Sequence, residues 1–449
     1  MSDTNADAKI TCPDCGNAPV NHTLYKGAII FEMIFTPFIY FFGGITHFFQ
    51  FITKPLRVAN AWPRIFKLLA NVGLGKIATE PDDKTTSRAK AFWNEAKRRG
   101  IKMWEFQLFS MGREFFVAEY KTAEGTIKTL SFEGLPRIDT KTGKLTDPKS
   151  IDWIDNKATM RKKFAKAGIP VARGGKVFSF GAAKKIFSEI QAGDAQQSVI
   201  IKPHQGSRSR HTTVHIQDEA TLKIAFRKAK RLSPFVLIEE ELVGMVHRVT
   251  LIGGKVIGIL RREPPSVFGD SVHTIAELIA AENQNPLRSG PTFHELVVND
   301  ETHTELARQN VTLESIPANG HIIFLHQKAS RGIGGGATDL TDVAHADNIA
   351  LFEYIAKYLD DSIVGIDFII ADMKQSWKET AKCGVIECNS LPFIDLHLYP
   401  LVGTPRDTAG ALWDLVLPES KSSSLFKMSH VEYGETVTPT IISDIIERK

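Results

Sequence analysis

The spacing of hydrophobic and polar positions predicts a small mixed module in the first third of the chain. Residues 85–100 (TTSRAKAFWNEAKRRG) start with a candidate N-cap, keep helical spacing and end at a glycine, so we expect a helix there. Runs rich in aromatic and β-branched residues follow (WEFQLF, EFFVAEY and TIKTLSFEG), and such runs are typical of strands. This module is expected to end near residue 150.

The same spacing predicts a larger body of helices and strands after residue 155. Residues 155–168 (DNKATMRKKFAKAG) form a predicted helix that stops at Gly168. The next patterns are a strand, loop and strand (SVIIKPHQGSRSRHTTVHI), a buried strand that ends in acids (FVLIEEELVG), and a hairpin that turns at Gly253 and Gly254 (HRVTLIGGKVIGILRREPP). Together these patterns favour an α+β protein.

Residues 28–52 form a much more hydrophobic stretch, with nine aromatic residues in 25 positions. As a helix this stretch would be about 37 Å long, enough to cross a bilayer. Polar and helix-breaking residues interrupt it, which suits a segment that lies in the membrane interface. These residues are Glu32, Pro37, Gly43, Gly44, His47 and Gln50. We expect contact with a membrane surface, and a single span or a buried helix at an oligomer contact remain as alternatives.

Cationic and aromatic residues directly follow this stretch, as is typical at the cytoplasmic face of a membrane. They are Lys54, Arg57, Trp62, Arg64 and Lys67, the last three within an amphipathic segment (AWPRIFKLLANVG). We therefore expect the rest of the chain to lie in the cytoplasm, associated with the inner face of a membrane.

Composition and charge exclude some classes of protein. The 449 residues are enough for two or three domains, and 43% hydrophobic with 24% charged residues is ordinary for a folded protein. The net charge of +4 is small and its basic residues are scattered, so no nucleic-acid partner is expected. The basic runs at 161–163 and 227–231 fall on predicted helices, where we interpret them as solvated faces.

Four cysteines are too few for a disulfide scaffold and fit a reducing compartment. Cys383 and Cys388 are predicted core residues. Cys12 and Cys15, in CPDCG, resemble one knuckle of a zinc ribbon, although a tetrahedral site needs four ligands. His22 could add one ligand and a second copy of the chain the others, which would make a homo-oligomer. Besides binding Zn²⁺, Cys12 and Cys15 could form a redox pair or have no special role.

Three oxygen-bearing side chains fall on two strands that are consecutive in the sequence. Glu387 and Asn389 are two positions apart in GVIECNSLP, so they point to one face of a strand. Asp367 interrupts the apolar strand GIDFII, where a carboxylate needs a cation or hydrogen-bond donors. If the two strands pair antiparallel, the three side chains meet at a site for Mg²⁺ and nucleotide phosphates, one acid bridging two ions. A solvated strand end is the plainer alternative.

Lys202 ends a buried strand next to a loop rich in Gly, Ser and Arg. An ammonium at this position can reach phosphates as a point charge, and the loop backbone can close over them. A surface lysine beside a mobile hairpin is the alternative interpretation.

In ordered combination these motifs resemble the ATP-grasp superfamily, most closely the ATP-grasp domain of the cyanophycin synthetase family. The resemblance covers residues 155–418 through DNKATMRKKFAKAGIPVARG, IIKPHQG, VLIEEELVG, HRV, FGDSVHTIAELI, GIDFII and IECNSLP. It implies an ATP-grasp fold, in which two α/β subdomains clasp ATP, preceded here by the small α/β module and the hydrophobic segment.

The resemblance also implies roles for particular residues. Lys157 and Lys202 would contact ATP phosphates, and Gly206 and Ser207 would open the loop that covers them. The residues beside adenine would be Glu239, Glu240, Glu241 and Leu242. Arg248, Arg262 and Arg331 would hold phosphate or the substrate carboxylate, the last within the glycine-rich segment SRGIGGGATD (330–339). Asp367, Glu387 and Asn389 would hold two Mg²⁺ ions.

The chain departs from the family pattern at several positions. Ser209 and His211 stand where the family usually has glycines in the phosphate loop. Arg208 precedes Ser209, and Arg210 lies between Ser209 and His211, so loop closure is expected to differ. Val246 stands where an acid often binds the ribose hydroxyls. The Mur-ligase-like half of the cyanophycin synthetase family is not expected in this chain, so synthesis of cyanophycin itself is not expected either.

The function that the sequence predicts is ATP-dependent joining of a carboxylate to an amine through an acyl-phosphate, on an amino acid or short peptide. The alternatives are transfer of phosphate to another acceptor and a membrane-tethered nucleotide-binding module without turnover. A third alternative, a zinc-ribbon protein that binds nucleic acid, is supported only by the CPDC motif.

The predicted domain order has six parts. They are a CxxC segment (1–24), a membrane-interacting segment (25–75), a small α/β module (76–154), two ATP-grasp subdomains (155–235 and 236–418) and a polar tail (419–449).

Overall fold

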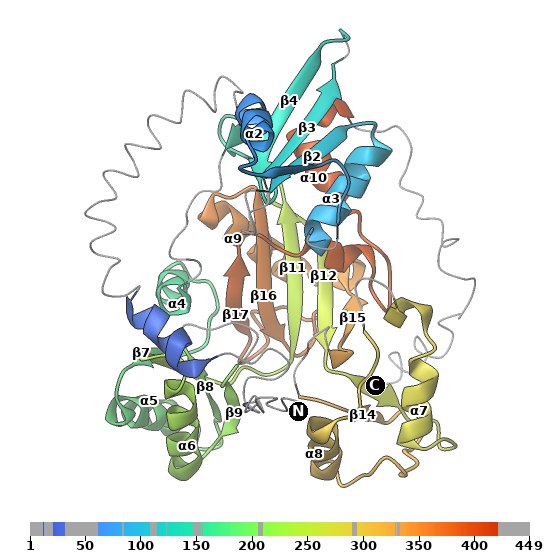
Figure 1. Cartoon of the computed structure of the whole chain (residues 1–449). Helices are drawn as coiled ribbons and strands as arrows, with labels where there is room; N and C mark the ends of the chain where they lie inside the picture. The colour runs from blue at the N-terminus through green and yellow to red at the C-terminus, as the bar shows by residue number, and fades with distance from the viewer. Residues whose placement is uncertain are drawn as a thin grey trace, which may run out of the picture. The chain divides into compact units, whose positions relative to one another are not determined.

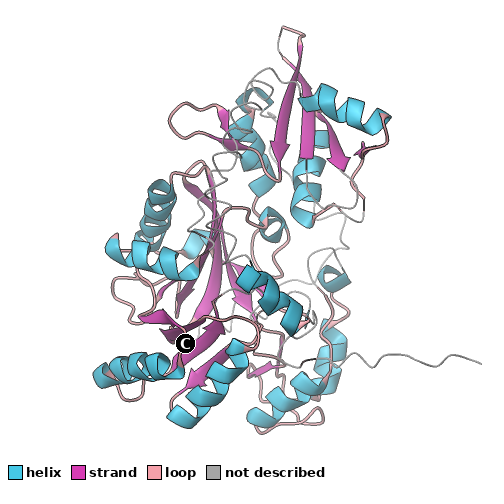
Figure 2. Cartoon of the chain, turned by 60° about the vertical axis from the view of Figure 1, so that its left-hand side comes forward, coloured by secondary structure: helices cyan, strands magenta, loops and turns pink. Residues whose placement is uncertain are grey.

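The computed structural model describes residues 12, 21–31, 62–82, 85–107, 115–122, 124–146, 154, 156–204, 210–289, 294–327, 329 and 333–420. Contacts group the chain into two compact units, each made of two stretches of sequence. Unit 1 comprises Met1–Lys54 and Asp152–Val243, and unit 2 comprises Pro55–Ile151 and Gly244–Lys449. Strands lie inside the units and helices pack against their sheets (Figure 2).

Unit 1 contains a four-stranded antiparallel sheet in the order β7-β10-β8-β9 (Figure 1). Its strands are β7 (Gly174–Val177), β8 (Val199–Pro203), β9 (Thr213–Ile216) and β10 (Val236–Glu240), and its helices are α4 (Lys157–Lys166), α5 (Phe180–Gly193), α6 (Glu219–Lys230) and residues 22–31. The side chains of Asn156, Ser179 and Asp218 accept backbone hydrogen bonds at the first turns of α4, α5 and α6, which fixes where these helices begin.

The core of unit 1 lies between the sheet and the helices α5 and α6. Alternate strand residues Val199, Ile201, Val236 and Ile238 face this core with side chains from both helices. Because side chains alternate along a strand, Lys202 on β8 and Glu239 on β10 project from the opposite face.

The central sheet of unit 2 is antiparallel, in the order β15-β12-β11-β16-β17 (Figure 1). Its strands are β11 (Met245–Ile252), β12 (Lys255–Glu263), β15 (Gly336–Asp339), β16 (Ile363–Ile370) and β17 (Gly384–Asn389). Helix α9 (Ala346–Leu359) covers one face, where Phe352 meets Phe368 edge to face with ring centroids 5.3 Å apart.

A second sheet of unit 2 has the order β1-β2-β3-β4. It is formed by β1 (Lys76–Ala78), β2 (Lys102–Gln107), β3 (Phe115–Lys121) and β4 (Ile127–Glu133), and it packs with α2 (Trp62–Asn71), α3 (Ser87–Arg98) and α10 (Thr408–Val416). Trp413 stacks on Phe92 at 4.2 Å between centroids, which holds α10 against α3. Phe66 of α2 stacks on Phe106 of β2 at 4.7 Å, so part of the apolar face of this amphipathic helix is buried in the protein.

The remaining elements of unit 2 are short. They are β5 (Arg137–Ile138), β6 (Leu145–Thr146), β13 (Ser266–Phe268), β14 (Ile322–Phe324), α7 (Ile275–Glu282), α8 (Asp300–Arg308), η2 (Pro286–Ser289), η4 (Thr341–Val343), η5 (Ile394–Leu398) and η6 (Pro418–Ser420). β13 pairs with β14, and a small apolar core joins this pair to α7 and α8.

The expected mixture of helices and sheets is confirmed, and the sheets are antiparallel. Most of the hydrophobic stretch, residues 32–52, lies outside the described residues. Among the helices that are described, none has both the length and the apolar character needed to cross a membrane. The six predicted segments remain predictions, and β10, placed by the sequence at the start of the second subdomain, pairs with β7 and β8 in unit 1.

Candidate active site

Lys202 and Glu239 form a nearly buried ion pair on the face of the unit 1 sheet that α5 and α6 leave uncovered. The Lys202 Nζ lies 2.5 Å from the Glu239 carboxylate, and the two side chains are 17% and 8% exposed. Burial works to raise the pKa of Glu239, but the ammonium of Lys202 outweighs it and holds the pKa below its usual value. The pair therefore stabilises the fold at pH values above the pKa that Glu239 has in the unfolded chain. This stabilisation is lost as the pH falls through the lower pKa that Glu239 has in the folded protein.

Two cations of α4 strengthen the positive field around this pair. Lys157 and Arg161 also lower the pKa of Glu239, and they stand one helical turn apart on α4. The run of basic residues predicted that Arg161 lies with its neighbours on a solvated face, whereas Arg161 is half-buried and Lys162 and Lys163 are exposed. The i,i+4 spacing from Lys157 is the signal that would have singled out Arg161.

The carboxylates predicted to lie beside adenine are held by protein groups. Arg173 donates to Glu240 from its backbone N–H at 2.7 Å and from Nε at 2.6 Å. Glu241 accepts hydrogen bonds from the Ser198 hydroxyl at 2.6 Å and from the His215 backbone at 3.0 Å. These acids therefore hold β10 and the end of β8 in place, and their contact with a base stays a prediction, as does that of the buried Leu242.

The predicted phosphate loop is described only at its ends. Gly206, Ser207, Arg208 and Ser209 lie outside the described residues. His211 is buried at 1% exposure and has a φ of +52°, in the left-handed region that glycine adopts most readily. His211, which the resemblance places at a glycine position of the family, thus has a backbone conformation that glycine adopts readily.

In unit 2, three charged side chains form one row across three strands. The strand register places Arg248 of β11 opposite Asp367 of β16, and Asp367 opposite Glu387 of β17. Directly paired residues of antiparallel strands project from the same face. Asn389 pairs with Gly365, two positions from Asp367, so its side chain belongs to the same face.

Arg248 and Asp367 form a buried bidentate ion pair within this row. The guanidinium donates from Nε to Oδ1 and from Nη2 to Oδ2, the latter at 2.8 Å. Burial alone would lower the pKa of Arg248, but Asp367 and then Glu387 outweigh it and raise that pKa. Nη1 of Arg248 is buried and has no hydrogen-bond partner within the described part of the chain, which leaves a donor for a ligand.

Glu387 and Asn389 have the chemistry that Mg²⁺ prefers. Both are half-buried, whereas Cys388 between them points to the opposite face and is buried. The amide Nδ2 of Asn389 is buried without a hydrogen-bond partner among the described residues, so no group there fixes this amide through Nδ2. Oxygen ligands on one face fit a magnesium ion, with Asp367 shared between the ion and Arg248. Their assignment as ligands stays a prediction.

Arg262, another predicted residue of unit 2, belongs to the same face of the central sheet as Arg248. Arg262 of β12 stands opposite Val246, and its Nη2 donates to the Ala329 carbonyl at 2.7 Å. Arg331 lies outside the described residues. Gly334, in the glycine-rich segment, has a φ of +87°, and a Cβ there would lie 2.8 Å from Leu296, so this position requires glycine.

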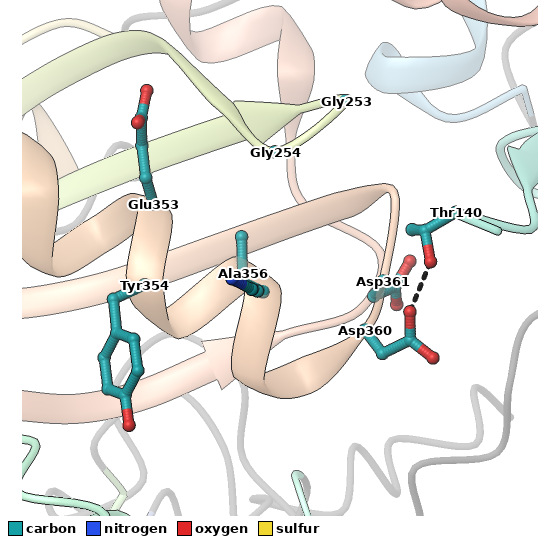
Figure 3. A pocket seen from close by; sticks show the side chains of 9 residues that line it. Thr140, Gly253, Gly254, Glu353, Tyr354, Ala356, Asp360 and Asp361 are labelled. Atoms are coloured by element: carbon teal, nitrogen blue, oxygen red, sulfur yellow. Dashed lines mark hydrogen bonds between the residues drawn. The ribbon is translucent and has the colours of Figure 1, made fainter.

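A hollow of about 470 Å³ in unit 2 contains none of the predicted site residues. It lies between the Gly253–Gly254 turn, the end of α9 and Thr140, which donates a hydrogen bond to Asp360 (Figure 3). Asp361, which lines this hollow, lies two residues before β16. Asp367 follows six residues after Asp361, which corresponds to about 20 Å along a strand. The predicted site residues of the Asp367 row therefore do not line this hollow.

The ordered motifs, together with the fold that carries them, match an assignment to the ATP-grasp superfamily, close to cyanophycin synthetase. It is similar to the cyanophycin synthetase of Trichormus variabilis, with 28% identity over 363 residues, and to that of Synechocystis, with 30% over 285 residues. It is also 30% identical over 277 residues to the glutathione biosynthesis bifunctional protein GshAB of Pasteurella multocida. No protein-family model matches the chain.

These similarities cover most of this chain but only part of each relative. The alignments take in 80%, 62% and 59% of this chain and 38%, 32% and 36% of the three relatives, respectively. The crystal structure of the bifunctional glutathione synthetase from P. multocida matches with a TM-score of 0.55 and 25% identity, over 74% of this chain and 44% of that chain. The fold is therefore shared with that structure, while the activities of the whole relatives do not transfer directly.

Proposed function

We propose that the protein is an ATP-dependent carboxylate–amine ligase that forms an amide bond and releases ADP and phosphate. The observation that carries this proposal is the row of Arg248, Asp367 and Glu387 on one sheet face, with Asn389 beside it. The relatives named cyanophycin synthetase and glutathione biosynthesis protein support the same reaction class. We extend the proposal to an amino acid or short peptide as the substrate.

The reaction takes place in two steps. An oxygen of the substrate carboxylate attacks the γ-phosphorus of ATP, the bond to the bridging oxygen breaks, and ADP leaves. The amine then attacks the carbonyl carbon of the acyl-phosphate, and phosphate leaves with the carboxylate oxygen while the amine loses a proton. Such reactions depend on positioning and on neutralising phosphate charge, more than on covalent chemistry by the protein.

The cations of each unit have distinct proposed roles in this reaction. In unit 1, Lys202 with Lys157 and Arg161 would neutralise phosphate oxygens, and Glu239 keeps the Lys202 ammonium in place. In unit 2, the Nη1 of Arg248 and the guanidinium of Arg262 would hold a phosphate or the substrate carboxylate. Asp367, Glu387 and Asn389 would hold Mg²⁺, which supplies charge neutralisation at the phosphates when bound.

The first test uses hydroxylamine in place of the amine. Purified protein is incubated with ATP, Mg²⁺, hydroxylamine and pools of amino acids and short peptides, and ADP and hydroxamates are measured by mass spectrometry. We expect ADP and hydroxamate in equal amounts with the correct acid, because hydroxylamine attacks an acyl-phosphate. ADP without hydroxamate would favour transfer of phosphate to another acceptor. No ADP with any pool would favour a binding module without turnover.

Membrane association is part of the proposal for residues 28–52. Their aromatic content and the cations that follow support a location at the inner face of a membrane. We expect the full-length chain to float with vesicles that contain anionic lipid. Recovery of all the protein in the lipid-free fraction would contradict this. Self-association, and Zn²⁺ at Cys12 and Cys15, also remain proposals.

A further inference from the structure

Three potential metal ligands from distant parts of the sequence meet in unit 1. They are Cys12, His22 at the start of the helix formed by residues 22–31 (dark blue in Figure 1), and His211 in the connection between β8 and β9. The thiol sulfur and one nitrogen from each ring all lie within 4.8 Å of one another. Among the described residues, no other group of three or more His, Cys, Asp or Glu side chains is arranged in this way.

Two of the three distances between the ligand atoms match those around a tetrahedral zinc ion. The Sγ of Cys12 lies 3.6 Å from the Nε2 of His211, and the Nε2 atoms of His211 and His22 lie 3.3 Å apart. With zinc–sulfur and zinc–nitrogen bonds of about 2.3 and 2.05 Å, tetrahedral angles give ligand separations of about 3.6 and 3.3 Å. These two separations therefore have the lengths that zinc would impose, and the separation between Cys12 and His22 lies within 4.8 Å.

The two imidazole rings are also oriented for a common ion. They cross at 87°, so their Nε2 atoms converge without stacking of the rings. The Nδ1 of His211 lies 2.8 Å from the Lys228 carbonyl, which can only accept a hydrogen bond. Nδ1 therefore carries the proton and Nε2 presents its lone pair, the usual state of a zinc-bound histidine.

We propose that Cys12, His22 and His211 bind a structural Zn²⁺ ion. His211 is the ligand that the sequence does not indicate, because it lies 189 residues from His22. Cys15, the other cysteine of the sequence motif, lies outside the described residues, and the fourth coordination position is not assigned. Zinc at this site would join the N-terminal segment to the β8–β9 connection through coordinate bonds.

A second contact reinforces the same junction. The ammonium of Lys26, one helical turn after His22, donates to the Lys230 carbonyl at the end of α6 at 3.0 Å. The carbonyl that orients His211 belongs to Lys228 in the last turn of the same helix. Zinc would thus complete an attachment of residues 22–31 to the end of α6 and to His211, which follows the predicted phosphate loop.

The competing interpretation is a hydrogen-bonded cluster of one thiol and two imidazoles. In that arrangement the Nε2 of His211 would accept from both Cys12 and His22, and an N–H···N distance of 3.3 Å is longer than usual. Zinc binding and hydrogen bonding differ in metal content and in the state of the thiol, so a metal measurement separates them.

The test measures metal content and the cobalt spectrum of the full-length protein. We expect about one zinc ion per chain after purification, and after exchange to Co²⁺ a sulfur-to-cobalt charge-transfer band with the intense visible bands of tetrahedral cobalt. Cys12→Ser should remove the charge-transfer band, and His22→Ala and His211→Ala should each lower the zinc content at least tenfold. These readouts do not depend on ligase activity, so they also hold if the proposed reaction is wrong.

The control is His215→Ala, which removes an exposed histidine of the adjacent strand β9 and should leave zinc and the cobalt spectrum unchanged. Cys12 and His22 are only partly buried, so their variants are expected to fold, as checked by circular dichroism. Wild-type protein that takes up no stoichiometric Zn²⁺ or Co²⁺ would overturn the proposal. A tetrahedral cobalt spectrum retained in His211→Ala would overturn the assignment of His211.

Discussion

Replacement of Glu387 by glutamine is expected to reduce ADP formation by about a thousandfold, the effect of losing several kcal/mol of charge stabilisation in the transition state. Glutamine keeps the size of the side chain and removes the charge that a magnesium ligand contributes. Glu387 is half-buried on the same face as Asp367 and Asn389, and these two residues would remain in place. Turnover should therefore fall, and the remaining activity should need more Mg²⁺.

The matched control for Glu387 is Glu353→Gln. Glu353 lines the separate hollow beside α9 and pairs with the exposed Lys255 at 3.2 Å, so loss of its charge should leave turnover and Mg²⁺ dependence unchanged. Initial rates of ADP release across a Mg²⁺ titration, with thermal unfolding as a check on folding, measure both variants. Full turnover of Glu387→Gln at the wild-type Mg²⁺ requirement would remove Glu387 from the metal site.

Replacement of Lys202 by methionine is expected to lower both turnover and stability. Turnover should fall by about a hundredfold or more, because one preorganised charge at the phosphates is lost. Stability should fall by about 3–5 kcal/mol, because the carboxylate of Glu239 would remain buried without its cation 2.5 Å away.

A second substitution separates the two effects of Lys202→Met. Glu239→Gln removes the buried charge, so the double variant should recover most of the stability but not the turnover. Glu239→Gln alone should keep turnover within about tenfold of wild type if the ammonium, and not the carboxylate, acts on phosphate. Urea unfolding and ADP release on the four proteins complete the cycle. Recovery of turnover in the double variant would show that Lys202 acts only through stability.

Much of the central sheet could be predicted from the two-residue periodicity of its strands. The spacing of Glu387 and Asn389 indicated a common strand face, and an acid inside an apolar strand indicated that Asp367 needed a partner. The two strands pair antiparallel, with Asp367 opposite Glu387. The identity of that partner was not predictable, because Arg248 lies 119 residues away and meets Asp367 only through the pairing of β11 with β16.

Contacts between distant residues account for what the sequence did not reveal. The resemblance assigned Glu239 to the base, which stays a prediction, and only the pairing of β8 with β10 shows that its carboxylate contacts Lys202. Arg161 was grouped with exposed lysines because a run of charges does not say which member faces inward. Cys12 and His22 were recognised as candidate ligands, whereas His211 joins them through a contact that spans 199 residues from Cys12.

Oxygen transfer from the substrate to phosphate tests the proposed ligase reaction most directly. The acid identified with hydroxylamine is labelled with ¹⁸O in its carboxylate and incubated with ATP, Mg²⁺ and the amine. Mass spectrometry then measures the label in the released phosphate. We predict one ¹⁸O atom in each phosphate, because an acyl-phosphate passes a carboxylate oxygen to phosphorus before the amine displaces it. Phosphate without ¹⁸O, released together with the amide, would contradict the account.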